Sequence, residues 1–309
     1  MIGTFEQLLN NASTFLPQRV AVVMPSNAET FEAIRDSLKA LRVTFLLVGD
    51  GEQIARGIGG RAIDSSRVTV IHEPDPQGAL QRAVTAARDG EADILLKGSV
   101  DTGTMMRAVL DEKCGLRTGR LLSDIFVLEY PPREENKFIM ITDGGMTLAP
   151  DLKNKVELIV NAVEVAHALG NECPKVAVLS ATEFVLPALQ STIDAAALSK
   201  MNERGQIKGC LVDGPFALDN AISNEAAAEK RIASKVAGRA EILVAANIES
   251  ANSLAKSTTY FAGLRLAHVI VGGKVPVLIP SRADKADARL LSVALGLIMS
   301  EYHRRIRGD

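Results

Sequence analysis

Residues 93–102 read DILLKGSVDT: an apolar run ends in Lys97 and Gly98, and hydroxyl and carboxyl side chains follow at once. A continuous apolar run, without alternation, is typical of a strand covered on both faces of a parallel sheet. The same order, a short apolar run followed by a polar start to a helical segment, recurs along the chain. Strands that alternate with helices in this way predict an α/β fold.

The remaining expected elements follow from the same patterns. Strands are predicted where branched apolar residues cluster: Val20–Met24, Thr44–Val48, Val68–Ile71, Asp93–Lys97, Ile125–Tyr130, Phe138–Thr142, Val176–Ser180, Gly209–Val212, Ile242–Ala245, His268–Val271 and Val275–Pro280. Helical spacing and composition predict helices over Glu29–Leu41, Pro76–Asp89, Thr102–Lys113, Leu152–Leu169, Leu186–Glu203, Glu225–Val236 and Asp284–Glu301. The polar stretch 131–136, PPREEN, predicts a hairpin or loop between two strands, so the mostly parallel sheet should be mixed.

The length of 309 residues exceeds what one hydrophobic core usually supports, so we expect two α/β domains. The sequence Asp143-Gly144-Gly145 is the natural seam between a strand and a long helix. We therefore predict a first domain over residues 1–147 and a second over 148–285, with a final helix over 286–309 that returns to the first.

Composition excludes several classes of protein. The net charge is only −2, with 35 basic and 37 acidic residues, so the basic footprint of a nucleic-acid-binding protein is missing. No apolar stretch approaches the length of a membrane span, and the N-terminus lacks the pattern of a secretion signal. Three scattered cysteines suit neither a disulfide framework nor a zinc cluster. These features predict a cytoplasmic protein without nucleic-acid or membrane partners.

Ligands of open parallel sheets bind beyond the carboxyl ends of the strands, so the residues that follow each apolar run are the candidates. At the first junction, Lys97, Gly98 and Thr102 stand between a strand and a helix start, where exposed amides and a cation form an anion pocket. Arg107 follows on that helix. Base rates favour the alternative that these cations are solvated surface charges.

Two further junctions carry weaker signals. Asp213 and Asp219 flank a turn that contains Gly214, and they either line a cleft or serve as a turn residue and a helix cap. Asn252 and Lys256 lie in a polar stretch that either lines a cleft or only begins a helix.

The last junction is the most suggestive. Ser281, Arg282, Asp284 and Asp287 crowd the end of a strand at a helix start. An arginine at the positive end of a helix calls for an anion, and a serine hydroxyl can stabilise an oxyanion. The four histidines have no ligand spacing, so we expect no metal, and the standard nucleotide and hydrolase motifs are absent from the sequence.

In order, these junctions resemble the phosphate acetyl/butyryltransferase family over nearly the whole chain. The matching pieces are short: Lys97–Thr102, Arg107–Leu110, Gly115–Gly119, Ile141–Asp143, Ala149–Leu152, Asp213–Pro215, Ala217–Ala221, Val236–Ala240, Lys274–Val277 and Ser281–Asp284. The resemblance implies a two-domain α/β/α fold similar to isocitrate and isopropylmalate dehydrogenases, with an active-site cleft between the domains and a homo-oligomeric assembly.

The resemblance also implies a reaction. Members of the family convert acyl-CoA and inorganic phosphate into acyl phosphate and CoA, without a metal, a bound cofactor or a covalent acyl-enzyme. It makes Ser281 and Arg282 catalytic and Arg107 a phosphate ligand, with Lys97, Gly98 and Thr102 beside it. Asp213, Gly214, Asp219, Asn252 and Lys256 are then expected to line the cleft for CoA.

One departure from the family pattern leaves the general base open. The acetyl branch places its catalytic aspartate where this chain has Ala288, so the base is either Asp284 or Asp287. Asn247 and Ala251 replace residues common in the acetyl branch, which favours a short-chain, butyryl-type substrate over acetyl.

Two other functions stay open at this point. A dehydrogenase of the same fold would need a cluster of metal-binding carboxylates, which the sequence does not show. A non-catalytic acyl-CoA-sensing module could lose Ser281 or Arg282, and both are present.

Overall fold

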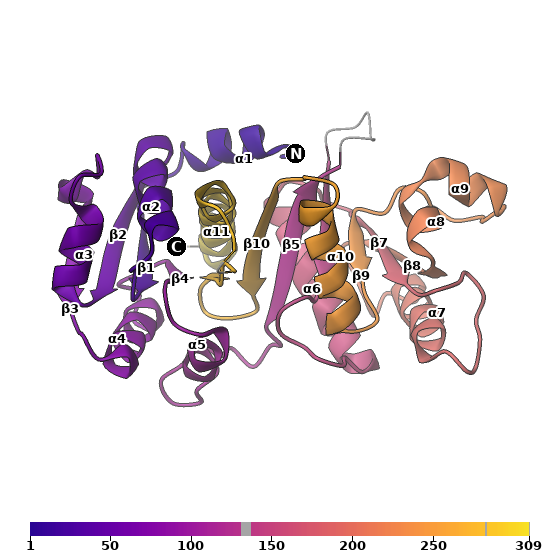
Figure 1. Ribbon diagram of the computed structural model, residues 1–309. Coiled ribbons are helices and arrows are strands. Elements are labelled where there is room, and N and C mark those ends of the chain that lie inside the picture. Colours follow the sequence, from indigo (N-terminus) through magenta and orange to yellow (C-terminus); the bar gives the residue numbers. More distant parts are fainter. Residues whose placement is uncertain (131–136, 282, 309) are drawn as a thin grey trace. The chain divides into compact units, whose positions relative to one another are not determined.

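A computed structural model describes residues 1–130, 137–281 and 283–308 (Figure 1). The chain forms two compact units. Unit 1 contains Met1–Thr4 and Leu121–Leu266, and unit 2 contains Phe5–Arg120 and Ala267–Asp309. The chain therefore changes unit near residues 120 and 266, whereas the sequence places the changes near residues 147 and 285.

Unit 2 is built around a sheet with the strand order β3-β2-β1-β4-β11-β10, in which only the pair β10 and β11 is antiparallel among the described pairings. Its strands are β1 (Gln18–Val23), β2 (Val43–Gly49), β3 (Val68–His72), β4 (Ile94–Lys97), β10 (Leu266–Val271) and β11 (Val277–Leu278). Its helices are α1 (Phe5–Ala12), α2 (Ala28–Ala40), α3 (Gly51–Ile58), α4 (Pro76–Arg88), α5 (Thr102–Val109) and α11 (Ala286–Arg307), with a short 3₁₀ turn at Ser65–Arg67.

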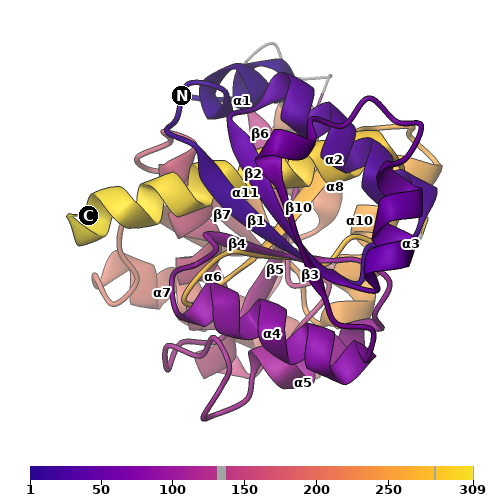
Figure 2. The same ribbon diagram turned by 90° about the vertical axis from the view of Figure 1, so that its left-hand side faces the viewer.

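Helices cover both faces of this sheet. Figure 2 shows the strands of unit 2 between α4 on one face and α2 and α3 on the other. Both faces of β1 are buried from Val20 to Val23, which explains its continuous apolar run. The long helix α11 packs against α1 and α2, so the end of the chain completes the unit that its beginning starts.

Unit 1 has the strand order β5-β6-β9-β7-β8, in which β5 and β6 are antiparallel and the other pairs are parallel. Its strands are β5 (Ser123–Glu129), β6 (Phe138–Thr142), β7 (Lys175–Leu179), β8 (Leu211–Phe216) and β9 (Ile242–Val244). Its helices are α6 (Leu152–Ala168), α7 (Gln190–Glu203), α8 (Leu218–Ile222), α9 (Asn224–Glu229) and α10 (Ile248–Tyr260).

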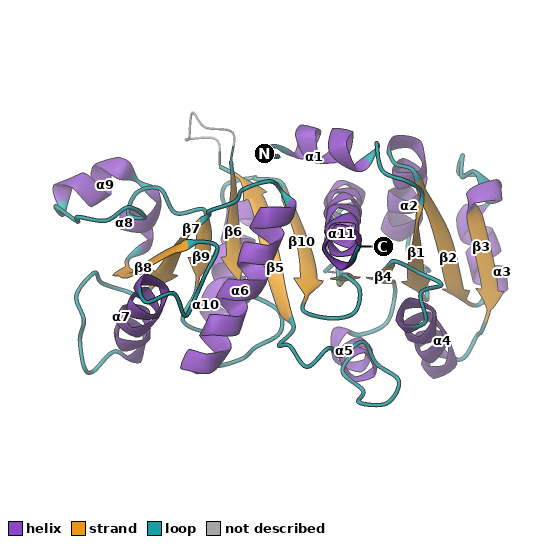
Figure 3. Cartoon of the chain, turned by 180° about the vertical axis from the view of Figure 1, so that it is seen from behind, coloured by secondary structure: helices purple, strands orange, loops and turns teal. Residues whose placement is uncertain are grey.

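The two long helices α6 and α10 cover opposite faces of β6, and α6 lies on the near side in Figure 3. On the α10 side, Phe126 of β5 and Ile141 of β6 pack in one core cluster with Ala251 and Ala255. Small residues on α10 let the helix approach the sheet closely. Because β5 and β6 are paired strands of one sheet, the change of unit falls before β5 and not after β6.

The predicted fold class is confirmed, including a mixed sheet that is mostly parallel. Every expected strand has a counterpart among β1 to β11, whereas α1, α3 and α8 are additional helices. The stretch with Asn252 and Lys256, for which a helix start was one of two alternatives, forms α10. The predicted helix over Glu225–Val236 is shorter in the structure, where α9 ends at Glu229. The predicted loop over residues 131–136 lies outside the described residues.

Candidate functional site

The carboxyl ends of three neighbouring strands meet at one edge of the unit 2 sheet. In the parallel register, Val23 of β1 lies beside Lys97 of β4, and Leu96 lies beside Leu278 of β11. The segments that leave these strands therefore emerge side by side. They carry Ser26, the stretch Lys97–Thr102 and Ser281, so two of the predicted junctions share one edge of the sheet.

The first junction is tightly built. The Lys97 side chain is buried, and its Nζ donates to the carbonyl of Val100 at 3.3 Å, so this cation braces the turn. A Cβ on Gly98 would stand 2.2 Å from the carbonyl oxygen of Val23, so only glycine fits there. Ser99 follows Gly98 and is exposed. Its hydroxyl oxygen lies 2.5 Å from the hydroxyl oxygen of Ser26.

Asp101 caps α5, because its Oδ1 accepts the amide N–H of Thr104 at 2.8 Å. Hydrogen bonds from Thr104 hold the pKa of the Asp101 carboxyl below its usual value. Thr102 is exposed in the first turn of this helix. The guanidinium of Arg107 is exposed one turn further on and donates to the Thr104 hydroxyl at 2.7 Å. Arg107 and Thr104 line a pocket of about 410 Å³ between α4 and α5.

The last junction forms a closed turn around Ser281. Its amide donates to Oδ2 of Asp284 at 2.7 Å, and the amide of Asp284 donates back to the Ser281 carbonyl at 3.1 Å. His268 Nε2 lies 3.9 Å from the same carboxylate oxygen. Asp287 is exposed in the first turn of α11. The fourth predicted residue, Arg282, lies outside the described residues.

Arg289, which no pattern in the sequence singles out, holds this turn in place. Its side chain is 3% exposed; Nη2 donates to the carbonyl of Ser281 at 3.0 Å and Nε to that of Asp284 at 3.2 Å. Burial lowers the pKa of the Arg289 guanidinium. In the sequence it looks like any basic residue on a helix, because its partners become visible only once the turn is folded.

In unit 1, the predicted cleft residues Asp213 and Gly214 are engaged by their own unit. Asp213 Oδ1 accepts from Ser199 Oγ at 3.0 Å, and Oδ2 accepts from Ser234 Oγ at 2.5 Å. The Gly214 amide also donates to Asp213 Oδ1, and a Cβ at this glycine would meet the Val178 carbonyl at 2.7 Å. Asp213 and Gly214 therefore anchor the loop within unit 1.

The remaining predicted cleft residues differ in exposure. Asp219 is exposed and pairs with Lys230 at 3.5 Å. Asn252 Nδ2 donates to the carbonyl of Gly144 at 2.9 Å, which ties α10 to the segment after β6. Lys256 is exposed one turn further along α10. Asp219 and Lys256 are therefore exposed, whereas Asn252 makes a loop contact.

The segment that follows β6 is centred on a buried carboxylate. Asp143 accepts the backbone amides of Asp124, Gly145, Met146 and Thr147 at 2.9 to 3.1 Å. Burial raises the pKa of Asp143 to about 6, and the neighbouring charge of Asp124 adds to the rise. The predicted seam is thus a turn closed by hydrogen bonds to Asp143.

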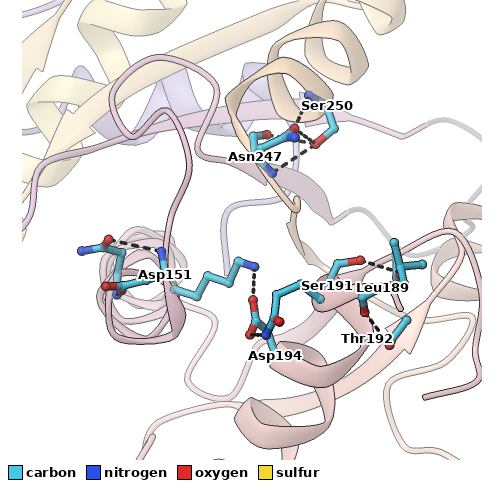
Figure 4. A network of polar contacts seen from close by, with 11 residues as sticks. Asp151, Leu189, Ser191, Thr192, Asp194, Asn247 and Ser250 are labelled. Carbon is cyan, nitrogen blue, oxygen red and sulfur yellow. Dashed lines mark hydrogen bonds and ion pairs between the residues drawn. The ribbon is translucent and has the colours of Figure 1, made fainter. Parts of the chain in front are cut away.

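Figure 4 shows a polar network at the starts of the helices that follow β6, β7 and β9 in unit 1. Asp151 caps α6 and Asn247 caps α10, each in a reciprocal capping box. Between α6 and α7, the buried Lys155 Nζ lies 2.5 Å from Asp194 Oδ2. This network orders three helix starts at the carboxyl edge of the unit 1 sheet.

Among the residues that the structure describes, no group of His, Cys, Asp and Glu gathers as a metal site would require. No helix in the described part of the chain is long and apolar enough to cross a membrane.

Each unit has strands covered by helices, with polar residues at the carboxyl ends of the strands, as in α/β enzymes. The family described as phosphate acetyl/butaryl transferase matches residues 76–296. The chain belongs to this family.

Relatives from both branches support this assignment. The chain is 41% identical to phosphate butyryltransferase from Clostridium beijerinckii (strain ATCC 51743 / NCIMB 8052) over 98% of this chain and 100% of that protein. It is 42% identical to phosphate acetyltransferase from Thermotoga maritima (strain ATCC 43589 / DSM 3109 / JCM 10099 / NBRC 100826 / MSB8) over 92% of this chain and 95% of that protein. Sequence identity therefore does not separate the two substrates.

The fold has solved counterparts. A branched-chain phosphotransacylase from Enterococcus faecalis V583 superposes with a TM-score of 0.80 at 30% identity, over 92% of this chain and 99% of that one. A 4-hydroxythreonine-4-phosphate dehydrogenase from Klebsiella pneumoniae has a TM-score of 0.54 at 13% identity, over 92% of this chain and 99% of that one. The second likeness concerns the fold alone, and it agrees with the dehydrogenase-like architecture expected from the sequence.

Proposed function

We propose that the protein is a phosphate acyltransferase that reversibly converts a short-chain acyl-CoA and inorganic phosphate into acyl phosphate and CoA, with butyryl preferred over acetyl. The observation that carries the proposal is the shared sheet edge in unit 2, where the Lys97–Thr102 turn and the Ser281–Asp284 turn emerge from adjacent parallel strands. Family membership supplies the reaction class.

In the direction of thioester synthesis, a carboxylate takes the proton of the CoA thiol. The thiolate sulfur then forms a bond to the carbonyl carbon of the acyl phosphate, and the bond from that carbon to the phosphate oxygen breaks. A thiol with a pKa near 8.5 is mostly protonated at neutral pH, so a positioned base raises its reactive fraction. Inorganic phosphate leaves with the electron pair.

The proposal assigns roles to a serine, two arginines and one aspartate. The Ser281 hydroxyl stabilises the oxyanion of the tetrahedral intermediate, and Arg282 and Arg107 bind the phosphate. Asp284 is the better-supported base, because its carboxylate is held at the turn of Ser281. Asp287, exposed in the first turn of α11, is the alternative.

The experiment is a thiol-release assay with dithiobisnitrobenzoate, in which the protein is mixed with phosphate and acetyl-, propionyl-, butyryl- or isobutyryl-CoA. We expect phosphate-dependent release of CoA, fastest with a four-carbon chain. Each methylene buried in an acyl pocket contributes about 0.8 kcal/mol, so butyryl should exceed acetyl about tenfold in kcat/KM. If no acyl-CoA releases CoA in the presence of phosphate, acyltransferase activity is refuted and the non-catalytic acyl-CoA-sensing module becomes the favoured function.

The acetyl reaction is the second candidate, because the Thermotoga maritima relative named phosphate acetyltransferase is 42% identical. A kcat/KM for acetyl-CoA above that for butyryl-CoA would favour it. The proposal also includes a homo-oligomer in the cytoplasm. The free cysteines Cys114, Cys173 and Cys210 suit a reducing compartment. Sedimentation of the purified protein tests the assembly.

A further inference from the structure

A pocket of about 340 Å³ lies between α2 and α3 in unit 2, apart from the pocket that Arg107 lines. Its lining comes from the segment before α2, the first turns of α2, and α3 with the residues that follow it: Ser26, Ala28, Phe31, Gln53, Arg56, Gly57 and Arg61. These side chains lie outside residues 76–296 and, Ser26 apart, outside the candidate site described above.

The lining is cationic. Arg56 and Arg61 contribute two guanidinium groups, and none of the described residues that line the pocket is acidic. Glu52 is the carboxylate paired with Arg56, at 4.0 Å, and both side chains are more than two-thirds exposed. An exposed pair at this distance is worth little, so the guanidinium of Arg56 can turn to an anionic ligand at small cost.

The second guanidinium is held in place before any ligand arrives. Arg61 Nη1 donates to the carbonyl of Gly57 at 2.7 Å, and its Cζ lies 5.8 Å from the centre of the Phe31 ring. A Cβ on Gly57 would stand 2.1 Å from this ring, so α3 packs directly on α2. A guanidinium has five N–H donors, and the bond to Gly57 occupies one of them. A positioned donor loses little entropy on binding.

The pocket adjoins the predicted phosphate junction. Ser26 lines the pocket, and its hydroxyl lies 2.5 Å from that of Ser99 in the Lys97–Thr102 turn. Ala28 is the first residue of the 13-residue helix α2, whose N-terminal end carries a partial positive charge. The two arginines, the hydroxyl and the helix start together suit a ligand with several phosphate charges.

We propose that this pocket binds the phosphate groups at the adenosine end of CoA, an inference that rests on the proposed acyltransferase function. CoA carries a diphosphate and a 3′-phosphate at that end, while its thiol sits at the other end of a long pantetheine arm. Binding the nucleotide phosphates beside Ser26 directs the arm toward the strand ends that carry Ser99 and Ser281. Arg56 and Arg61 thus act as binding residues, remote from the reacting atoms.

The test is the double variant Arg56→Gln/Arg61→Gln, assayed in thioester synthesis from acyl phosphate. We expect the KM for CoA to rise 10- to 100-fold, because two charged hydrogen-bond donors are lost. The kcat and the KM for acyl phosphate should stay within threefold. Pantetheine lacks these phosphates, so the wild type and the variant should have the same kcat and the same KM for pantetheine. The single variant Arg56→Gln, with an exposed side chain, gives a smaller effect without risk to folding.

Comparison of CoA with 3′-dephospho-CoA identifies the bound group. If the pocket holds the 3′-phosphate, dephospho-CoA has the same raised KM in wild type and double variant; if it holds the diphosphate, the variant raises the KM of both thiols. Calorimetry with adenosine 3′,5′-bisphosphate needs no turnover, and we expect its affinity to fall at least tenfold in the variant.

The matched control is Arg305→Gln. Arg305 also lies over a phenylalanine ring, 5.9 Å from the centre of Phe15, but outside the pocket. The substitution Arg305→Gln should leave the KM for CoA unchanged. A folded double variant with wild-type KM for CoA and wild-type affinity for the bisphosphate overturns the inference while the acyltransferase function stands. Wild-type protein that forms no thioester from any acyl phosphate refutes the proposed function instead, and calorimetry then still tests the pocket.

Discussion

In both units, polar residues follow the carboxyl ends of the strands, but the two units use these residues differently. In unit 2, Ser99 and Arg107 follow strand ends with exposed side chains. In unit 1, Asp213 has both carboxylate oxygens bonded to serines of its own unit. A polar residue after a buried strand is therefore either a ligand-binding group or an anchor for the loop. What separates the two is whether the folded chain already satisfies its polar atoms.

The largest expected effect is at Ser281, on the ligand-binding side of this comparison. Ser281→Ala removes the hydroxyl proposed to stabilise the oxyanion, and loss of one such donor typically lowers kcat about 10²- to 10³-fold. The Ser281 backbone contacts with Asp284 and Arg289 do not need the hydroxyl, so the fold should persist. Steady-state kinetics with butyryl-CoA and phosphate measure the change.

Ser13→Ala is the control, because that exposed hydroxyl donates only to a nearby carbonyl in the same segment. An unchanged kcat in Ser281→Ala would place Ser281 among the anchors and remove it from the catalytic residues.

The next effect concerns Asp143, an anchor in unit 1. Its folded-state pKa of about 6 lies above the usual value of 3.8, so the folded protein binds a proton more tightly than the unfolded chain. Stability from this group is full below about pH 4 and is lost as the pH rises through 6. Asp143→Asn cannot ionise, so wild type should lose up to about 3 kcal/mol relative to the variant across this range.

Urea unfolding at several pH values between 4 and 7.5 measures that difference. Other titrating groups are common to both proteins and cancel. A constant difference in unfolding free energy would contradict the raised pKa of Asp143.

The smallest effect is expected at Asp213, and it tests directly whether this residue anchors a loop or binds substrate. Asp213→Ala leaves the hydroxyls of Ser199 and Ser234 without their shared acceptor, so the free energy of unfolding should fall by about 1–3 kcal/mol. The kcat and KM values of the folded variant should stay within threefold of wild type.

Asp219→Ala is the matched control from the same junction. Its exposed ion pair with Lys230 should contribute less than about 1 kcal/mol to the free energy of unfolding. A large rise in the KM for CoA in Asp213→Ala, with stability unchanged, would reverse the assignment and return Asp213 to the substrate cleft.

The fold was largely predictable because buried parallel strands appear in the sequence as continuous apolar runs. The helices that were missed or left open have weak local signals: α10 is rich in Ser, Asn and Thr, and α3 contains two glycines in eight residues. Both are helical because of what they pack against. Ala251 and Ala255 of α10 lie in the core of unit 1, and Ile54 of α3 is buried.

The candidate site was predictable only as far as strand ends could be located. The sequence shows that Asp213 and Ser281 follow strands, but the partners that distinguish them lie 14 and 21 residues away for Asp213. Arg289, which holds the Ser281 turn, has no local feature that sets it apart from a surface arginine. The roles of Asp213 and Arg289 depend on contacts between residues that are far apart in the sequence.

The order in which the chain enters its two units has a consequence for synthesis on the ribosome. Apart from its first four residues, unit 1 is one uninterrupted stretch that ends at Leu266, whereas the β4 strand of unit 2 pairs with β11, near the end of the chain. Since domains fold as they emerge, unit 1 can be complete while unit 2 still waits for α11. Until translation ends, the sheet edge beside β4 has no native neighbour, and a chaperone would have most to protect there.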